Sequence, residues 1–204
     1  MRRAVFIYFR ISQFASGNPR SCRQAAVARE CDFVRAAAAH THNRSAMPNT
    51  NIELIERFYR AFGNVDADAM AACYAPDVRF EDPAFGVLFG REAGDMWRML
   101  LHRARDFALS VDGIEALGQT ANATAVVRYT YSATGRPVVN EIRTRFTIRD
   151  GLIFEQTDAF DLWRWSRQAL GPAGWCFGWT PRMQQAIRRK ARRALADYRK
   201  EASA

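Results

Sequence analysis

The hydrophobic pattern of this chain changes its period once, and that change limits the folds open to it. Between residues 51 and 105, apolar side chains recur at the three- and four-residue spacing of helices. From Phe107 to Asp161 they alternate with polar side chains at the two-residue spacing of strands. Helices followed by a run of long strands predict an α+β fold, with the helices packed on one face of a strongly curved antiparallel sheet.

Glycine and proline divide the two halves into elements. Gly63 is suited to end the first helix, and Pro76 to close the second. Turns are expected where Gly118, Gly135 and Gly151 separate runs of alternating residues. The expected helices span residues 51–63, 66–75 and 91–105, and the expected strands span 78–82, 107–111, 121–134, 137–149 and 152–161.

Length and charge narrow the class of protein. A chain of 204 residues that is 49% hydrophobic predicts one domain with extensions. No apolar run approaches the roughly 20 residues of a membrane-spanning helix, so we expect a soluble, cytoplasmic protein. Of the net charge of +9, residues 1–46 carry +6 and residues 182–204 carry +6, which leaves about −3 for the middle. Because the basic charge lies at the two ends, no nucleic-acid partner is expected.

The four cysteines give no reason to expect a bound metal or cofactor. They form no C-x-x-C pair, and no cysteine and histidine have the spacing of a zinc site. Buried or unreactive thiols in a reducing compartment are the expected state. We therefore expect a protein that works without metal or organic cofactor.

The chain divides into three parts. Residues 1–46 are expected to be an extension, either upstream of a natural start at Met47 or a targeting or regulatory tail. Residues 47–165 form the predicted domain. Residues 166–204 hold a tryptophan-rich loop and a basic amphipathic helix at 181–200. The apolar stripe of that helix either docks on the domain or a second subunit, or lies on an anionic membrane surface.

Two carboxylates are predicted to point into the apolar interior. In the last strand Phe154, Gln156 and Asp158 share one face, and this face is expected to meet the helices. Asp82 continues the face of Val78 and Phe80. Burial disfavours the charged form of a carboxyl group and raises its pKa toward the range useful for proton transfer. The alternatives are an Asp–Pro turn at Asp82, and an Asp158 satisfied by a tryptophan N–H or an arginine.

Two segments give the chain a family resemblance. "CYAPDVRFEDPAFG", residues 73–86, and "RDGLIFEQTDAFD", residues 149–161, resemble the NTF2-like superfamily, within it the SnoaL-like and ketosteroid isomerase-like proteins. The resemblance covers residues 51–165. It implies a cystatin-like, cone-shaped α+β barrel with an apolar cavity, in many members a homodimer through the outer face of the sheet.

Comparison with ketosteroid isomerases assigns some residues and leaves others without a match. The resemblance places the general base at Asp82 and a tyrosine of the site at Tyr74. The two oxyanion donors of those enzymes fall on Phe58, with Tyr59 next to it, and near Thr144. Because neither position carries the expected donor, steroid isomerisation of that kind is not expected.

Two other branches of the superfamily give a similar result. Asp158 is similar to one catalytic acid of limonene epoxide hydrolase-like members, but their Arg-x-Asp pair falls on Ala125 and Val127, so epoxide hydrolysis is not expected. SnoaL-type polyketide cyclases need one acid/base aspartate and a shaped apolar cavity. Asp82 or Asp158 is compatible with that demand.

The sequence thus predicts a domain that binds a small, mostly apolar molecule, with isomerase- or cyclase-like chemistry by Asp82 and Asp158. Tyr129 and Tyr131 share a strand face, so both line the cavity or neither does. The alternative is a non-catalytic binding or assembly module that dimerises, or meets a membrane surface, through residues 166–204. The candidate ligand-binding residues are Phe58, Tyr59, Tyr74, Trp97, Tyr129, Tyr131 and Thr144.

Overall fold

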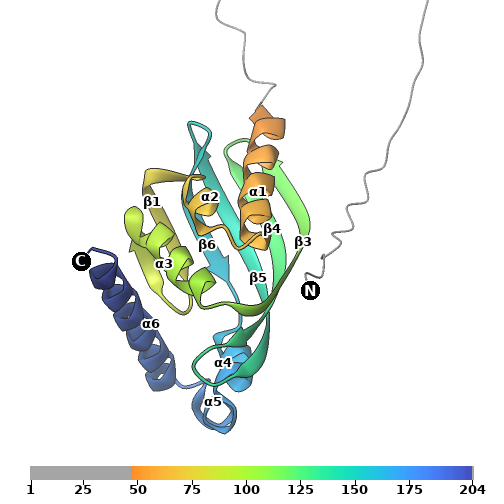
Figure 1. Ribbon diagram of the computed structural model, residues 1–204. Helices are drawn as coiled ribbons and strands as arrows, with labels where there is room; N and C mark the ends of the chain where they lie inside the picture. Colours follow the sequence, from red (N-terminus) through yellow and green to blue (C-terminus); the bar gives the residue numbers. More distant parts are fainter. Residues whose placement is uncertain (1–46, 204) are drawn as a thin grey trace, which may run out of the picture. The chain divides into compact units, whose positions relative to one another are not determined.

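A computed structural model describes residues 47–203 of the chain (Figure 1). The predictions for residues 1–46 lie outside the described residues. Three helices precede the long strands, and three more follow them. The helices are α1 (Met47–Gly63), α2 (Ala67–Ala71), α3 (Arg91–His102), α4 (Leu162–Leu170), α5 (Pro172–Phe177) and α6 (Pro181–Glu201). The strands are β1 (Tyr74–Asp82), β2 (Gly86–Phe89), β3 (Arg105–Leu117), β4 (Thr120–Tyr131), β5 (Arg136–Arg149) and β6 (Leu152–Ala159).

The six strands form one curved sheet in the order β2-β1-β6-β5-β4-β3, with α1, α2 and α3 on one face (Figure 1). The expected α+β layout, with helices on one face of a curved sheet, is confirmed, although the sheet does not close into a barrel. The sheet is mixed and not purely antiparallel, because β1 and β6 pair in parallel. The helix α3 lies between β2 and β3, so the chain crosses the sheet face before the three-hairpin run of β3 to β6 begins.

The start of β1 differs from the expected boundary. The second helix was predicted to run to residue 75, yet α2 ends at Ala71 and β1 begins at Tyr74, so Pro76 lies inside a strand. Pro76 has no N–H to donate to a ladder. The pairing of β1 with β6 shifts register between Tyr74 and Arg79, and this irregularity accommodates the proline.

A second irregularity corrects the predicted face of β6. The register of β5 and β6 shifts between Thr147 and Ile148. As a result Ile153 is buried, whereas Phe154 is only half-buried and lies under the guanidinium of Arg149, 3.7 Å from its centre. The prediction that Phe154 faces the helices is therefore wrong. Beyond the shift the predicted alternation holds, and the residues at 156 and 158 are buried.

Aromatic side chains fill the space between the helices and the sheet. Phe58 of α1 is the centre of this core, with its ring 5.9 Å from Phe146 of β5 and 6.2 Å from Trp97 of α3. Phe80 of β1 contacts Trp97 from the other side, with ring centres 5.8 Å apart. Burying several such rings accounts for a large share of the hydrophobic stabilisation of a domain of this size.

The C-terminal part is more ordered than the expected tryptophan-rich loop. Helices α4 and α5 occupy it, and α4 runs across the predicted domain boundary at residue 165. The apolar stripe of α6 lies on the domain, where Leu195 is 3% exposed. None of the helices within residues 47–203 is long and apolar enough to cross a lipid bilayer.

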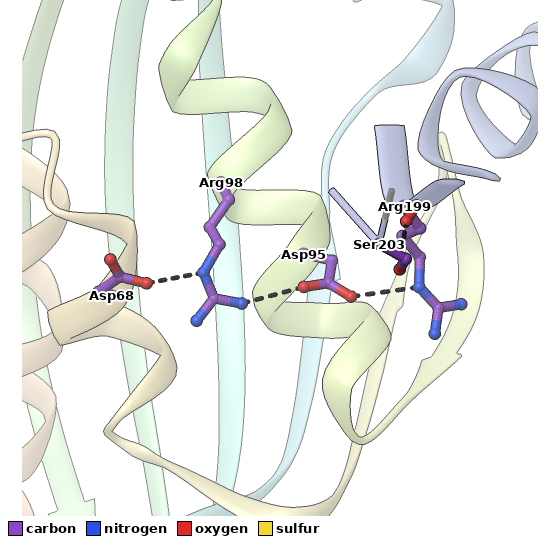
Figure 2. A network of polar contacts seen from close by, with 5 residues as sticks. All are labelled: Asp68, Asp95, Arg98, Arg199 and Ser203. Atoms are coloured by element: carbon purple, nitrogen blue, oxygen red, sulfur yellow. Dashed lines mark hydrogen bonds and ion pairs between the residues drawn. The ribbon is translucent and has the colours of Figure 1, made fainter. Parts of the chain in front are cut away.

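Three arginines hold α6 against the domain. Arg188 Nε donates to the carbonyl of Pro83 at 2.9 Å, and Arg192 Nε donates to that of Phe85 at 2.8 Å. Toward the C-terminal end, Arg199 Nε donates to Asp95 at 3.1 Å, and Figure 2 shows this contact as part of a larger network on α3. The helix α6 therefore bridges the loop that follows β1 and the helix α3.

Candidate functional site

Three neighbouring strands place Asp82, Asp158 and Thr144 in one row. Thr144 of β5 lies opposite Asp158 of β6. Glu81 of β1 pairs with Thr157 of β6, and the two strands run in parallel. The residues that follow them, Asp82 and Asp158, are therefore also neighbours. Adjacent strands lie about 4.8 Å apart. The fold thus brings together two carboxylates that are 76 positions apart in the sequence.

Asp158 is the end of a chain of buried hydrogen bonds. The indole N–H of Trp97 donates to the hydroxyl of Tyr74 at 2.8 Å, and that hydroxyl donates to Gln156 Oε1 at 2.7 Å. Gln156 Nε2 donates to Asp158 Oδ1 at 3.0 Å, and Thr144 Oγ1 donates to the same oxygen at 2.8 Å. Both bonds end on Oδ1, which leaves Oδ2 for another partner.

The surroundings of Asp158 give it a pKa suited to proton transfer near neutral pH. Burial raises its pKa from the ordinary value of 3.8 to about 7, and the negative charge of Asp82 contributes in the same direction. The hydrogen bonds from Gln156 and Thr144 favour the anion and oppose the rise. At neutral pH the carboxyl group is therefore close to half protonated, so it can donate or accept a proton.

Asp82 combines two features that the sequence analysis treated as alternatives, a cap of the following loop and a carboxyl group with a raised pKa. The backbone N–H of Phe85 donates to its Oδ1, and the amide groups of Ala84 and Gly86 also favour the ionised form. Asp82 is thus the cap of its own loop. Burial is the larger effect and raises its pKa to about 6, while the positive charge of Arg188 opposes the rise. The negative charge of Asp82 in turn raises the pKa of the neighbouring Asp158.

Tyr59 contributes a hydroxyl group without a partner. The residue is 6% exposed, and its Oη has no hydrogen-bond partner among the described residues. The neighbouring hydroxyl of Thr144 is directed at Asp158 instead. Burial and the nearby charge of Asp158 raise the pKa of Tyr59 above its ordinary value, and the adjacent Thr144 hydroxyl opposes the rise, so the Tyr59 hydroxyl keeps its proton. An unpaired buried donor beside an acid/base group is a candidate ligand contact.

The remaining predicted ligand residues divide between two places. Phe58, Tyr74 and Trp97 lie in the aromatic core around the row. Tyr129 and Tyr131 share a face, as predicted, but they meet α4. The indole N–H of Trp165 donates to the Tyr129 hydroxyl at 2.8 Å, and the ring of Tyr131 lies 5.3 Å from that of Trp165.

Sequence reasoning missed two residues of this site. Gln156 links Tyr74 to Asp158, and its place on the same strand face as Asp158, two residues away, was a signal that could have identified it. Trp165 covers Tyr129 and belongs to the segment assigned to the edge of the domain. Only the fold of α4 back over β5 brings it there, and no local pattern indicates that contact.

A hollow of about 530 Å³ lies on the other face of the sheet. Its lining includes Asn122 and Thr124 of β4, Arg143 and Arg145 of β5, and Ala159 of β6. Apart from Thr144, whose side chain points inward to Asp158, none of the site residues lines it. Within residues 47–203, no group of three or more histidine, cysteine, aspartate or glutamate side chains is arranged to hold a metal ion.

Comparison with known proteins identifies the family of the domain. The family model described as a SnoaL-like domain matches residues 55–156, half of the chain. The chain belongs to the SnoaL-like family. The matched residues include α1 from Ile55 onward, Asp82 with its loop, Thr144 and Gln156, whereas Asp158 and helices α4 to α6 lie beyond them. No curated protein matches the chain.

Solved structures share the fold of this SnoaL-like protein at low sequence identity. A proposed SnoaL-like polyketide cyclase from Jannaschia sp. CCS1 is 18% identical, with a TM-score of 0.56 over 64% of this chain and 98% of that one. A ketosteroid isomerase-like fold protein from Catenulispora acidiphila, in complex with trimethylamine, is 20% identical, with a TM-score of 0.54 over 63% and 98%. An LEH-like epoxide hydrolase from M. tuberculosis is 22% identical, with a TM-score of 0.53 over 60% and 91%.

The arrangement in this SnoaL-like domain is suited to acid/base chemistry on a ligand oxygen. Burial raises the pKa of both neighbouring carboxyl groups, and the charge of Asp82 raises that of Asp158 further. Such a pair supplies one ionised and one protonated group at the same pH. Tyr59 adds a second donor near the protonated one. These three groups are the ones from which acid/base chemistry could be built in this domain.

Proposed function

We propose that this SnoaL-like domain binds a small, mostly apolar molecule that carries a carbonyl group, and isomerises or cyclises it by acid/base chemistry. The observation that carries the proposal is the buried Asp158, half protonated near neutral pH, beside the unpartnered hydroxyl of Tyr59. Family membership supports the same class, since cyclases and isomerase-like proteins share the fold. The aromatic side chains around the row favour an apolar ligand.

The missing oxyanion donors have replacements in this proposal. The position that carries a donor acid in ketosteroid isomerases falls near Thr144, and Thr144 donates to Asp158 on the neighbouring strand. In this proposal Asp158, on that neighbouring strand, supplies the acidic hydrogen-bond donor. The donor tyrosine falls on the apolar Phe58, and Tyr59 supplies a hydroxyl from the next position of α1. Two donors directed at one oxygen stabilise the negative charge that forms on it.

The proposed isomerisation moves one proton within the ligand. Asp82 takes a proton from the carbon between the carbonyl group and a β,γ double bond, and the C–H electron pair enters the conjugated system. The carbonyl oxygen gains negative charge and accepts hydrogen bonds from Tyr59 and protonated Asp158. Asp82 then returns the proton to the γ carbon, which gives the conjugated ketone. No other reactant is needed.

Isomerisation of 3-cyclohexen-1-one to 2-cyclohexen-1-one by the full chain tests this step, because the conjugated product absorbs more strongly in the ultraviolet. The rate should follow a bell-shaped pH profile, rising as Asp82 ionises near pH 6 and falling as Asp158 loses its proton near pH 7. Tyr59→Phe should lower kcat by roughly 100-fold or more. Tyr198→Phe, on the outer helix α6, is the matched control and should leave the rate unchanged.

The alternative is a binding module without catalysis, and binding of 2-naphthol distinguishes it. The phenol-like hydroxyl of this probe mimics the enolate oxygen, and its fluorescence reports whether it is bound. Binding that Tyr59→Phe weakens, without turnover of the ketone, would assign the domain to the binding class. Binding and turnover that are both absent, or both insensitive to Tyr59→Phe and Asp158→Asn, would overturn the proposed site.

A further inference from the structure

The packing of α5 against α4 turns a group of aromatic side chains outward. Gly174 and Gly178 lie against Ser166 of α4, which is fully buried. A Cβ atom on Gly174 would lie 1.9 Å from the Ser166 carbonyl oxygen, and one on Gly178 would lie 1.9 Å from its Oγ. Only glycine fits at these contacts, so the inner side of the turn is fixed. The larger side chains of this segment therefore lie on its outer side.

Four aromatic residues form the resulting surface, which we call the aromatic tip. Most other aromatic side chains of the described residues are buried or half-buried in the domain. Those of the tip are 37% to 61% exposed. The tip consists of Trp163, Trp175, Phe177 and Trp179. Its exposure is unusual because large apolar side chains on one short segment normally face a core or a partner.

Arg167 lies within the aromatic tip without an anionic partner. Its guanidinium stacks on the rings of Trp163 and Trp175, at 4.5 Å and 5.1 Å from their centres. The Nε atom is buried without a hydrogen-bond partner in the part of the chain that the structure describes. Arg167 also takes part in none of the ion pairs among residues 50–203. The tip therefore combines exposed indole rings with a positive charge that no acidic side chain of the described residues neutralises.

Helix α6, which follows the aromatic tip in the chain, is strongly basic. Residues 168–181 contain no charged side chain, and residues 182–204 carry a net charge of +6. Arg188, Arg192 and Arg199 hold the helix to the domain. The basic residues that make no such contact and are exposed form the outer basic face, namely Arg182, Arg189, Lys190, Arg193 and Lys200. This face begins three residues after Trp179.

We propose that the aromatic tip and the outer basic face dock the chain onto an anionic membrane surface. Indole rings favour the boundary between water and acyl chains, and basic side chains favour anionic headgroups. An uncharged aromatic segment followed by a basic helix separates these two kinds of contact, whereas proteins that stack nucleic-acid bases combine aromatic and basic side chains in one groove. The apolar stripe of α6 packs on the domain, so the tip supplies the apolar contact. This inference is independent of the proposed chemistry.

Flotation of the full chain with lipid vesicles tests the proposal. Binding is expected to vesicles of phosphatidylcholine with 30% phosphatidylglycerol at low salt, and to weaken as salt rises. Binding to pure phosphatidylcholine should be weaker by orders of magnitude. Neutralising Arg189, Lys190 and Arg193 to Gln should weaken binding about fivefold per residue, on the order of 100-fold together.

Two further variants test whether vesicle binding depends on this surface or only on the total charge of the chain. The control neutralises Arg128, Arg143 and Arg145, which are exposed on the sheet, and should retain binding within about twofold. A second variant, Trp175→Ala with Phe177→Ala and Trp179→Ala, should weaken binding at least about tenfold while far-ultraviolet circular dichroism stays unchanged. Quenching of tryptophan emission by brominated lipid should be lost with it.

Several results would overturn the proposal. One is absence of vesicle binding at low salt, and another is equal loss in the helix variant and the sheet control. A third is a chain whose dimer, measured by light scattering, dissociates when the aromatic tip is replaced, because the tip would then be covered by a second copy. A single-stranded oligonucleotide that binds through the same residues and is not displaced by anionic vesicles would assign the surface to nucleic acid instead.

Discussion

At the scale of single residues, the most informative group is Asp158, because its burial and its hydrogen bonds oppose each other. Removing the carboxyl group from water raises its pKa, and two donors on Oδ1 limit the rise. The result is a pKa of about 7, compared with 3.8 for an ordinary aspartate. A group in this state has a direct consequence for stability, which can be measured without a ligand.

The stability of the chain should fall as pH rises from about 4 to about 7. In this window the unfolded chain has ionised Asp158 and the folded chain has not, so the folded state binds more protons and rising pH favours unfolding. Asp158→Asn keeps the acceptor oxygen and removes the titration. Its free energy of unfolding should match that of the unchanged chain at pH 4 and exceed it at pH 8, by up to roughly 4 kcal/mol.

Urea denaturation at a series of pH values measures this difference. Asp112→Asn, on the exposed side of β3, is the matched control; it keeps Asp158, so its stability should fall with pH as that of the unchanged chain does. If Asp158→Asn is less stable than the unchanged chain at pH 8, the anion of Asp158 is a stabilising part of the fold. The proposed half-protonated acid would then be wrong.

At the scale of elements, the sequence was informative where each element is set by its own residues. The helical period predicted α1 and α3, and the strand period predicted β4 and β5 to within a few residues. It did not predict the parallel pairing of β1 with β6, because two strands 70 positions apart carry no signal for each other's direction. Nor could alternation find the shift that turns Phe154 outward, since a bulge changes parity without changing composition.

In the candidate site too, positions set by a single strand were predicted, and contacts with distant segments were not. Parity predicted that Asp82 and Asp158 lie in the interior because each continues an apolar strand face. Asp158 is buried, Asp82 is half-buried, and the two positions are neighbours. The two partners of Asp158 are Gln156 on the same strand and Thr144 on β5, whereas the sequence analysis offered a tryptophan N–H or an arginine. The contact of Trp165 with Tyr129 depends on how α4 folds back, so it required the structure.

Helix α6 should also influence the pKa of Asp82. Arg188 donates to the carbonyl of Pro83, and its positive charge favours the ionised form of the adjacent Asp82. Arg188→Ala removes that charge, so the pKa of Asp82 should rise from about 6 by roughly half a unit. Titration of the carboxyl carbon by NMR measures it. Arg189→Ala removes an equal charge from the next, outer position, and a shift as large there would mean that net charge alone is responsible.

At the scale of the whole folded unit, the C-terminal segment is part of the domain. Ile187 packs with the apolar cluster around Trp165, and Arg199 reaches α3 at the other end of the same helix. Between them α6 crosses the loop that holds Asp82 (Figure 1). A substitution that frees one end of α6 should therefore also affect this loop, although no residue of the candidate site is substituted.

The C-terminal end of α6 is held by a network that crosses three helices (Figure 2). Asp95 of α3 accepts from Arg98 at 3.0 Å and from Arg199 of α6 at 3.1 Å, and Arg98 continues to Asp68 of α2 at 2.7 Å. Arg199 also contacts Glu92 at 2.8 Å. The side chain of Asp95 is only 12% exposed, so its two arginine contacts are the least screened of the set.

Arg199→Ala should release this end of the helix. Because the side chain of Arg199 is 41% exposed, solvent screening reduces the loss to about 1 kcal/mol in the free energy of unfolding. Amide hydrogen exchange should quicken in residues 190–201 and, through Arg192, in the loop at 83–87, while the amides of α1 keep their protection. Lys200→Ala, at the exposed neighbouring position, is the matched control. Faster exchange in both variants alike, or in α6 without the loop, would show that the helix does not transmit its anchoring to the loop of Asp82.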